Sequence, residues 1–262
     1  MQLTTPEIVL WYSAILLELL VFGLAFWRRL YLHLPVFTGY LTVVIVREVF
    51  IYWVYYRAGY TSQLAFYSFW ASQAVQLAGR AASVGELAWC ASRPYPGFRV
   101  VLRWVLPGIA LVLLLRAAFV ATENAWHLPS FVLTLEREFE LTAAVLLVTL
   151  FALARWYQVG METFQRLIAA GLFVYSLVQV LNNAISRQWL ESYFHWWDAV
   201  RVASFHAALA IWLIALAKPL PAPAKMPAPP DPHALRDFMR QGTEVIHQLA
   251  ARLRRFRKRS GK

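Results

Sequence analysis

Seven long apolar stretches constrain the fold of this chain more than any other feature of its sequence. Each is close to or above the roughly 20 residues that a helix needs to cross the hydrocarbon core of a bilayer. They lie near residues 8–27, 36–56, 64–90, 100–119, 138–158, 164–186 and 196–217. Because backbone groups inside lipid must be satisfied by helices or closed barrels, the pattern predicts an all-α, polytopic bundle of seven transmembrane helices, with six spans as the alternative.

The composition agrees with a membrane protein and excludes several other classes. Hydrophobic residues make up 60% of the chain, against about 45–50% in soluble domains. A single cysteine, Cys90, permits neither an intrachain disulfide nor a cysteine-based metal site. The histidines are scattered, and no P-loop or nucleophile elbow occurs. The sequence therefore predicts no metal and no cofactor, and it does not favour an enzyme.

The basic residues between the stretches predict the orientation in the cytoplasmic (inner) membrane. One side would carry Arg28, Arg29, Arg93, Arg99, Arg103, Arg155 and Arg166, and the other Arg57, Arg116, Arg137, Arg187 and Arg201. The basic C-terminal segment strengthens the first side, which should therefore be cytoplasmic. We expect the N-terminus outside and the C-terminus in the cytoplasm.

The chain is expected to divide into three parts. Residues 1–218 would form the transmembrane domain, and residues 219–232, half of them proline, a semi-rigid linker. Residues 233–262 predict a basic amphipathic cytoplasmic helix. Anionic lipid headgroups are its expected partner, a homodimer through its heptad-like seam is one alternative, and a disordered basic tail is another. The net charge of +11 is concentrated there, so no nucleic-acid partner is expected.

The stretch 64–90 has one face that is unsuited to lipid. On a helical wheel Gln73, Gln76, Arg80 and Glu86 share one arc with several small residues. A polar stripe of this length inside hydrocarbon has to be covered by other helices or by water.

Further polar groups stand at membrane depth in other stretches. Glu18, Arg47 and Glu48 should lie at a similar depth. Since neighbouring helix residues point about 100° apart, we expect Arg47 to pair with Glu18. Glu48 would then pair with Arg80 or Gln76. The alternative is that these pairs only set helix register.

The last two stretches add amides and one histidine. Asn182 and Asn183 are expected to hydrogen-bond across the bundle, which is the commoner role of such amides in membranes. His206 lies on an alanine-rich face and should point inward, where packing is the more usual role of a lone histidine.

These residues predict a polar cavity between the second, third, sixth and seventh spans. The ligand-binding or proton-coupling candidates are Glu18, Arg47, Glu48, Gln73, Gln76, Arg80, Glu86, Asn182, Asn183 and His206. The first functional hypothesis is a receptor-like sensor that binds a small polar ligand. The alternatives are a small-solute or proton-coupled transporter and a structural subunit of a membrane complex.

The segment 67–104 resembles a recurring block in multi-spanning bacterial membrane proteins of about seven helices. The features that carry the resemblance are the aromatic run from Tyr67 to Trp70, then Glu86, and then the turn formed by Pro94, Tyr95 and Pro96. A fainter match covers residues 154–171. The resemblance implies the seven-helix architecture and implies no activity.

Overall fold

The computed structural model describes residues 5–93, 96–123, 128–156, 161–185 and 194–218, and within these ranges it contains helices and no strands. The helices are α1 (Thr5–Trp27), α2 (Pro35–Ala58), α3 (Gln63–Ala91), α4 (Pro96–Glu123), α5 (Leu128–Trp156), α6 (Thr163–Ile185) and α7 (Phe194–Ala217), with a short 3₁₀ turn, η1 (Leu30–Leu32), after α1. The all-α prediction is confirmed for this part of the chain. The predicted linker, 219–232, and tail, 233–262, lie outside the described residues.

Local sequence signals place several of the helix ends. Pro35 occupies the first turn of α2, where its missing N–H costs nothing. Gly59 ends α2 with a φ of 80°, a conformation that glycine adopts without strain. Ser62 then begins α3, and its hydroxyl accepts a hydrogen bond from the backbone N–H of Ala65 at 3.0 Å. The α2–α3 connection is therefore short and well defined.

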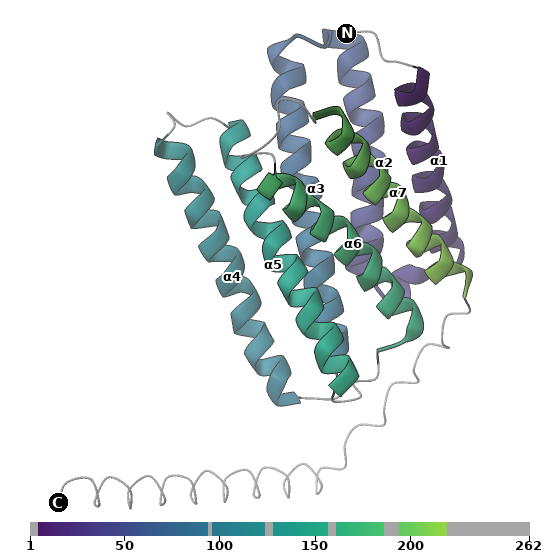
Figure 1. Ribbon diagram of the computed structural model, residues 1–262, viewed down its shortest axis with the longest axis vertical. Helices are drawn as coiled ribbons and strands as arrows, with labels where there is room; N and C mark the ends of the chain where they lie inside the picture. The colour runs from purple at the N-terminus through teal and green to yellow at the C-terminus, as the bar shows by residue number, and fades with distance from the viewer. Residues whose placement is uncertain (1–4, 94–95, 124–127, 157–160, 186–193, 219–262) are drawn as a thin grey trace, which may run out of the picture. The chain divides into compact units, whose positions relative to one another are not determined.

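Six of the helices form a closed ring, and α4 packs outside it. Around the ring, contacts join α1 to α2, α2 to α3, α3 to α5, α5 to α6, α6 to α7 and α7 back to α1. Helix α4 contacts only α3 and α5 (Figure 1). Successive helices run in opposite directions, as short connections require. The ring has a centre that side chains from α2, α3, α5, α6 and α7 can reach.

One end of the ring is where α1, α3, α5 and α7 end and where α2, α4 and α6 begin; we call it the basal end and the other the apical end (Figure 1). Two contacts between distant segments hold the basal end together. Arg28 Nη2 donates to the carbonyl of Ala217 at 3.4 Å. Glu86, near the end of α3, accepts hydrogen bonds from the first turn of α2.

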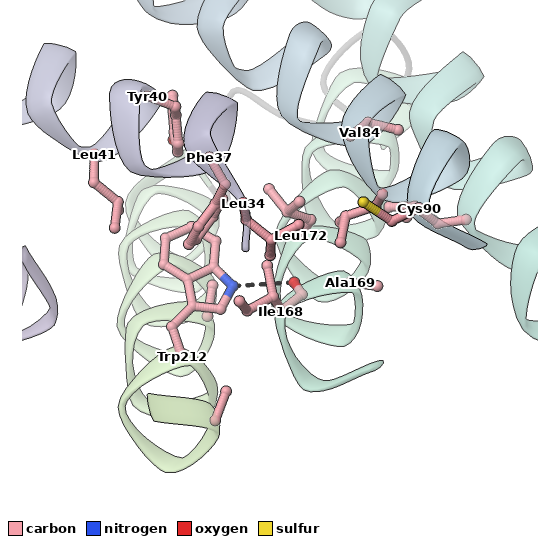
Figure 2. Close-up of a cluster of buried hydrophobic side chains, with 14 of the residues drawn as sticks. Leu34, Phe37, Tyr40, Leu41, Val84, Cys90, Ile168, Ala169, Leu172 and Trp212 are labelled. Carbon is pink, nitrogen blue, oxygen red and sulfur yellow. Dashed lines mark hydrogen bonds between the residues drawn. The ribbon is translucent and has the colours of Figure 1, made fainter. Parts of the chain in front are cut away.

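The basal half of the ring is filled by apolar side chains. Leu34, Phe37, Ile168, Leu172 and Trp212 are each at most 2% exposed, and we call them the basal apolar cluster. Trp212 reaches across from α7, stacks edge-on against Phe37 at 5.2 Å, and donates its indole N–H to the carbonyl of Ile168 at 3.1 Å (Figure 2). Apolar side chains from α2, α6 and α7 therefore occupy this part of the ring.

Three helices are long and apolar enough to cross a membrane. The qualifying segments are Pro35–Ala58, Arg99–Thr122 and Thr163–Asn182. Shorter apolar segments lie in α1 (Tyr12–Trp27) and α7 (Val202–Ala217). Helices α3 and α5 carry charged groups such as Arg80, Glu136 and Glu140, which lower their hydropathy. By composition alone, the chain thus has three clear spans among its described residues and not seven.

The outer surface of the seven described helices is rich in large apolar side chains. Trp27, Trp104 and Phe119 are 76%, 74% and 65% exposed, and many leucines and valines accompany them. Soluble monomers rarely expose apolar patches beyond a few hundred Å². This surface is compatible with membrane insertion.

The helix that contains the fifth expected span begins before the span itself. The sequence pattern placed the span from residue 138, whereas α5 begins at Leu128. The added turns are amphipathic: Val132 is fully buried while Leu133 is 53% exposed. Of the acidic residues in this part of α5, Glu136 and Glu140 face the buried Arg80, whereas Glu138 pairs with Arg116 of α4.

Candidate functional site

A connected chain of charged and amide side chains runs from the apical half of the ring to its middle. Its members are Arg47, Glu48, Gln73, Arg80, Glu136 and Glu140, from α2, α3 and α5, and we call them the polar network. At its first end Arg47 Nη1 donates to Glu48 Oε1 at 2.8 Å, and Nη2 donates to Gln73 Oε1 at 3.1 Å. The amide of Gln73 in turn donates to Glu136 Oε1 at 3.4 Å.

The second end of the network is centred on Arg80. Its Nη2 atom lies 3.4 Å from Glu136 Oε1 and 2.5 Å from Glu140 Oε1. Glu136 and Glu140 are four residues apart on α5, so their carboxylates face the same side of that helix. One guanidinium therefore holds two carboxylates, one at short range and one at longer range.

Burial increases from one end of the network to the other. The side chains of Glu48, Arg47 and Glu136 are 32%, 14% and 17% exposed, whereas those of Arg80 and Glu140 are 4% and 0% exposed. Taking an ion pair out of water is costly, and only close geometry with further partners compensates for it. The Arg80–Glu140 pair is thus the most desolvated charged contact among the described residues.

An aromatic ring packs against the guanidinium group of each network arginine, Arg47 and Arg80. The guanidinium of Arg80 lies 4.7 Å from the ring centre of Tyr175, and that of Arg47 lies 5.4 Å from Phe69. Such cation–π contacts are strongest where water is excluded. Gln179 donates to the Tyr175 hydroxyl at 2.8 Å, so α6 contributes to the site through its inward face. Helices α2, α3 and α5 supply the polar network, and α6 supplies the side chains beside it. Helix α7 contributes Trp212 to the basal apolar cluster.

The network contains more acid than base. Glu48, Glu136 and Glu140 oppose only Arg47 and Arg80. With every group ionised, the network would carry one net negative charge inside a bundle that solvates charge poorly. A proton or a cation is the simplest means of neutralising it.

The two carboxylates on α5 were not foreseen from the sequence. Glu136 and Glu140 lie in a run that also contains Arg137 and Glu138, and such charge density suggests a loop. The available signal was their four-residue spacing in phase with Val132, Phe139 and Ala143, which are all buried. Arg137, in contrast, is exposed.

The expected pairing of Arg47 and Glu48 was wrong in two respects. These neighbours were expected to have different partners, yet they form an ion pair at 2.8 Å, because a long guanidinium side chain can bend over the next residue. Glu48 pairs with neither Arg80 nor Gln76. Glu18 is 8% exposed and makes no ion pair with Arg47 among the described residues.

Glu86 lies outside the polar network. Its two carboxylate oxygens accept hydrogen bonds from the backbone N–H groups of Val36 at 2.9 Å and Phe37 at 2.8 Å. Leu34, at the N-cap of α2, has no side-chain acceptor to offer. A carboxylate from α3 therefore performs the capping that the local sequence lacks, and its charge is favourable at the positive end of the helix.

His206 is also satisfied within the packing, between α7 and α1. Its Nδ1 lies 2.8 Å from the carbonyl of Val202, so that nitrogen must carry the hydrogen, and Nε2 lies 2.9 Å from Ser13 Oγ. The histidine thus holds α7 against α1, away from the network residues.

The remaining candidates are less well connected. Gln76 interacts with the buried Tyr40. Asn182 is half-buried on α6, and the Asn183 side chain lies outside the described part of the chain. The structure therefore brings four of the ten sequence-predicted candidates, Arg47, Glu48, Gln73 and Arg80, into one hydrogen-bonded network.

Comparison of the chain with protein-family models, with curated proteins and with solved structures found no match in any of the three.

Proposed function

We propose that this chain is a seven-span membrane protein whose polar network binds a small polar ligand entering from the outside, as in a receptor-like sensor. The observation that carries the proposal is the uneven filling of the ring. The polar network runs from the apical half of the ring to its middle, and the basal half is filled by the basal apolar cluster. With the N-terminus outside, the apical end is external. Such a site opens toward one face of the membrane only.

The basal filling favours a sensor over a transporter. A transporter needs a polar route that reaches both faces in turn. The polar stripe of α3 would offer such a route, but its basal members are already occupied. Ser83 is fully buried and donates to the carbonyl of Gly79 at 2.8 Å, and Glu86 caps α2.

The accessibility of single cysteines tests this proposal. In a Cys90→Ala background, Gln73→Cys and Ser83→Cys place one thiol in each half of α3. We expect a membrane-impermeant sulfonated maleimide to modify the Gln73→Cys thiol from the external side. The Ser83→Cys thiol should stay unmodified from either side. Modification of both thiols, or of neither, would contradict a site open only outward.

Mass spectrometry of the purified protein tests for the ligand itself. A small polar molecule should accompany the wild-type chain and be lost from Arg80→Gln. Arg116→Gln is the matched control, because Arg116 is 62% exposed and pairs with Glu138 at 3.3 Å on the outer side of α5. Equal retention in all three proteins would count against the network as the binding site.

The acid excess supports proton-coupled transport as a second candidate. Glu48→Gln should then lower proton flux into vesicles that contain a pH-sensitive dye. Glu86→Gln serves as the control, because that carboxylate is engaged with the backbone of α2. Equal flux in the wild type and in Glu48→Gln would remove this candidate.

A further inference from the structure

Glu18 is a buried acidic side chain that has no ion-pair partner in the polar network. It lies in the middle of α1, is 8% exposed, and its Oε2 atom has no hydrogen-bond partner among the described residues. A carboxylate buried without a partner costs several kcal/mol or more, so such a group is normally neutral. The burial and the missing partner together indicate that Glu18 carries a proton.

The charged groups near Glu18 come from α2. Glu48 and Arg47 both interact with it electrostatically, with opposite effects on its charge. Among the described side chains of α7, His206 is a titratable group against α1, and it is hydrogen-bonded to Ser13. Residues Leu30–Leu32 of η1 contribute no charge. Glu18 thus faces one guanidinium and one competing carboxylate.

We infer that Glu18 and Glu48 share one exchangeable proton across the α1–α2 interface, and that Arg47 pairs with whichever of the two is ionised. In the structure Arg47 donates to Glu48 at 2.8 Å, so the proton resides on Glu18. In the alternative arrangement Arg47 turns to Glu18. The O–H bond on Glu18 then breaks and one forms on Glu48, so the total charge is unchanged.

This exchange is independent of the identity of any ligand. Arg47 also donates to Gln73, which contacts Glu136. A change of partner by Arg47 would therefore alter the accessible end of the polar network. The proton site is linked to the polar network through Arg47 and Glu48.

Infrared spectroscopy of the full chain in lipid vesicles tests the inference. At neutral pH the wild type should show a protonated-carboxyl C=O band that shifts on transfer to D₂O. Glu18→Gln should lose a component of this band. Glu18→Asp, which keeps a carboxyl group, should restore it. Glu86→Gln is the comparison variant and should leave the Glu18 component unchanged, because Glu86 lies near the basal end of α3 and contacts the backbone of α2.

The partner exchange has its own test in Glu48→Gln. With Glu48 neutral, Arg47 should turn to Glu18 and ionise it, so the Glu18 component should disappear. Persistence of the component in Glu48→Gln would overturn the sharing. A wild-type band that is unaffected by Glu18→Gln would overturn the proton site itself. Neither result depends on ligand binding, so failure here is distinguishable from failure of the proposed function.

Discussion

At the scale of single residues, the same ion-pair chemistry has different consequences at different depths. Arg80 is 4% exposed and contacts Glu136 and Glu140, whereas Arg116 is 62% exposed and contacts Glu138. Exposed pairs contribute little, because solvent screens them and ordering the side chains costs entropy. The buried arginine cannot be removed without leaving carboxylates that lack a counterion.

Arg80→Met should therefore destabilise the bundle by about 3–5 kcal/mol, the usual cost of breaking a buried pair. Arg116→Met should cost at most about 1 kcal/mol. Thermal unfolding in the same detergent measures both variants. The double variant Arg80→Met with Glu140→Gln should recover part of the loss, because one uncompensated charge is gone. Equal effects of the two single variants would contradict this account of the network.

Gly171 shows how a residue without a side chain can be essential to packing. A Cβ atom at this position would lie 2.8 Å from Trp212 Cδ1, 3.1 Å from the carbonyl oxygen of Ala208, and closer still to Trp212 Nε1. The indole would have to move and would lose its hydrogen bond to Ile168.

We expect Gly171→Ala to lower the free energy of unfolding by about 1–3 kcal/mol, as for other overpacked sites. Gly23→Ala is the control, since a Cβ at Gly23 meets no atom within 4 Å. That variant should be neutral or slightly stabilising, because alanine is the better helix former. Thermal unfolding of both variants provides the comparison, and a neutral Gly171→Ala would refute the packing argument.

At the scale of the elements, one helix completes the end of another. The first turn of α2 has backbone N–H groups without a local acceptor, and Glu86 of α3 supplies two carboxylate oxygens. This contact also fixes how far α3 can slide along α2.

Glu86→Ala should loosen the start of α2 by about 0.5–2 kcal/mol, the range seen when a capping acceptor is lost. Hydrogen exchange followed by mass spectrometry should show faster exchange in peptides covering Val36 and Phe37. Peptides from the α2–α3 connection at the apical end should exchange as in the wild type. Unchanged exchange at Val36 and Phe37 would mean that another group caps the helix.

At the scale of the whole molecule, the ring separates polar from apolar filling along its axis. The polar network runs from the apical half to the middle of the ring, the basal apolar cluster lies in the basal half, and α4 stays outside the ring. In the sensor proposed above, this division would give the two ends of the ring different tasks, access at the apical end and closure at the basal end.

Reporter fusions should therefore place the α1–α2 connection near Arg28 in the cytoplasm. The α2–α3 connection near Gly59 should be outside. The expectation follows from the excess of loop arginines at the basal end. A phosphatase reporter that is active at both sites would show that α2 does not cross the membrane, and would contradict the seven-span proposal.

The sequence by itself determined the helical class and most helix positions, because apolar runs and proline and glycine boundaries act locally. The second expected span, near 36–56, for example, lies within α2, which Pro35 and Gly59 bracket. It also showed that Arg47, Glu48, Gln73 and Arg80 belong to a polar interior, since charges of this kind cannot face lipid cheaply.

Only the tertiary structure decided which of these groups meet. Arg80 pairs with Glu136 and Glu140, and Glu86 caps α2, because α5 and α2 happen to pack at those positions along α3. Pairing of this kind depends on the rotation and axial offset of neighbouring helices. The rotation and offset of each helix are set by the packing of the whole ring. The periodicity of a single stretch of sequence therefore does not predict them.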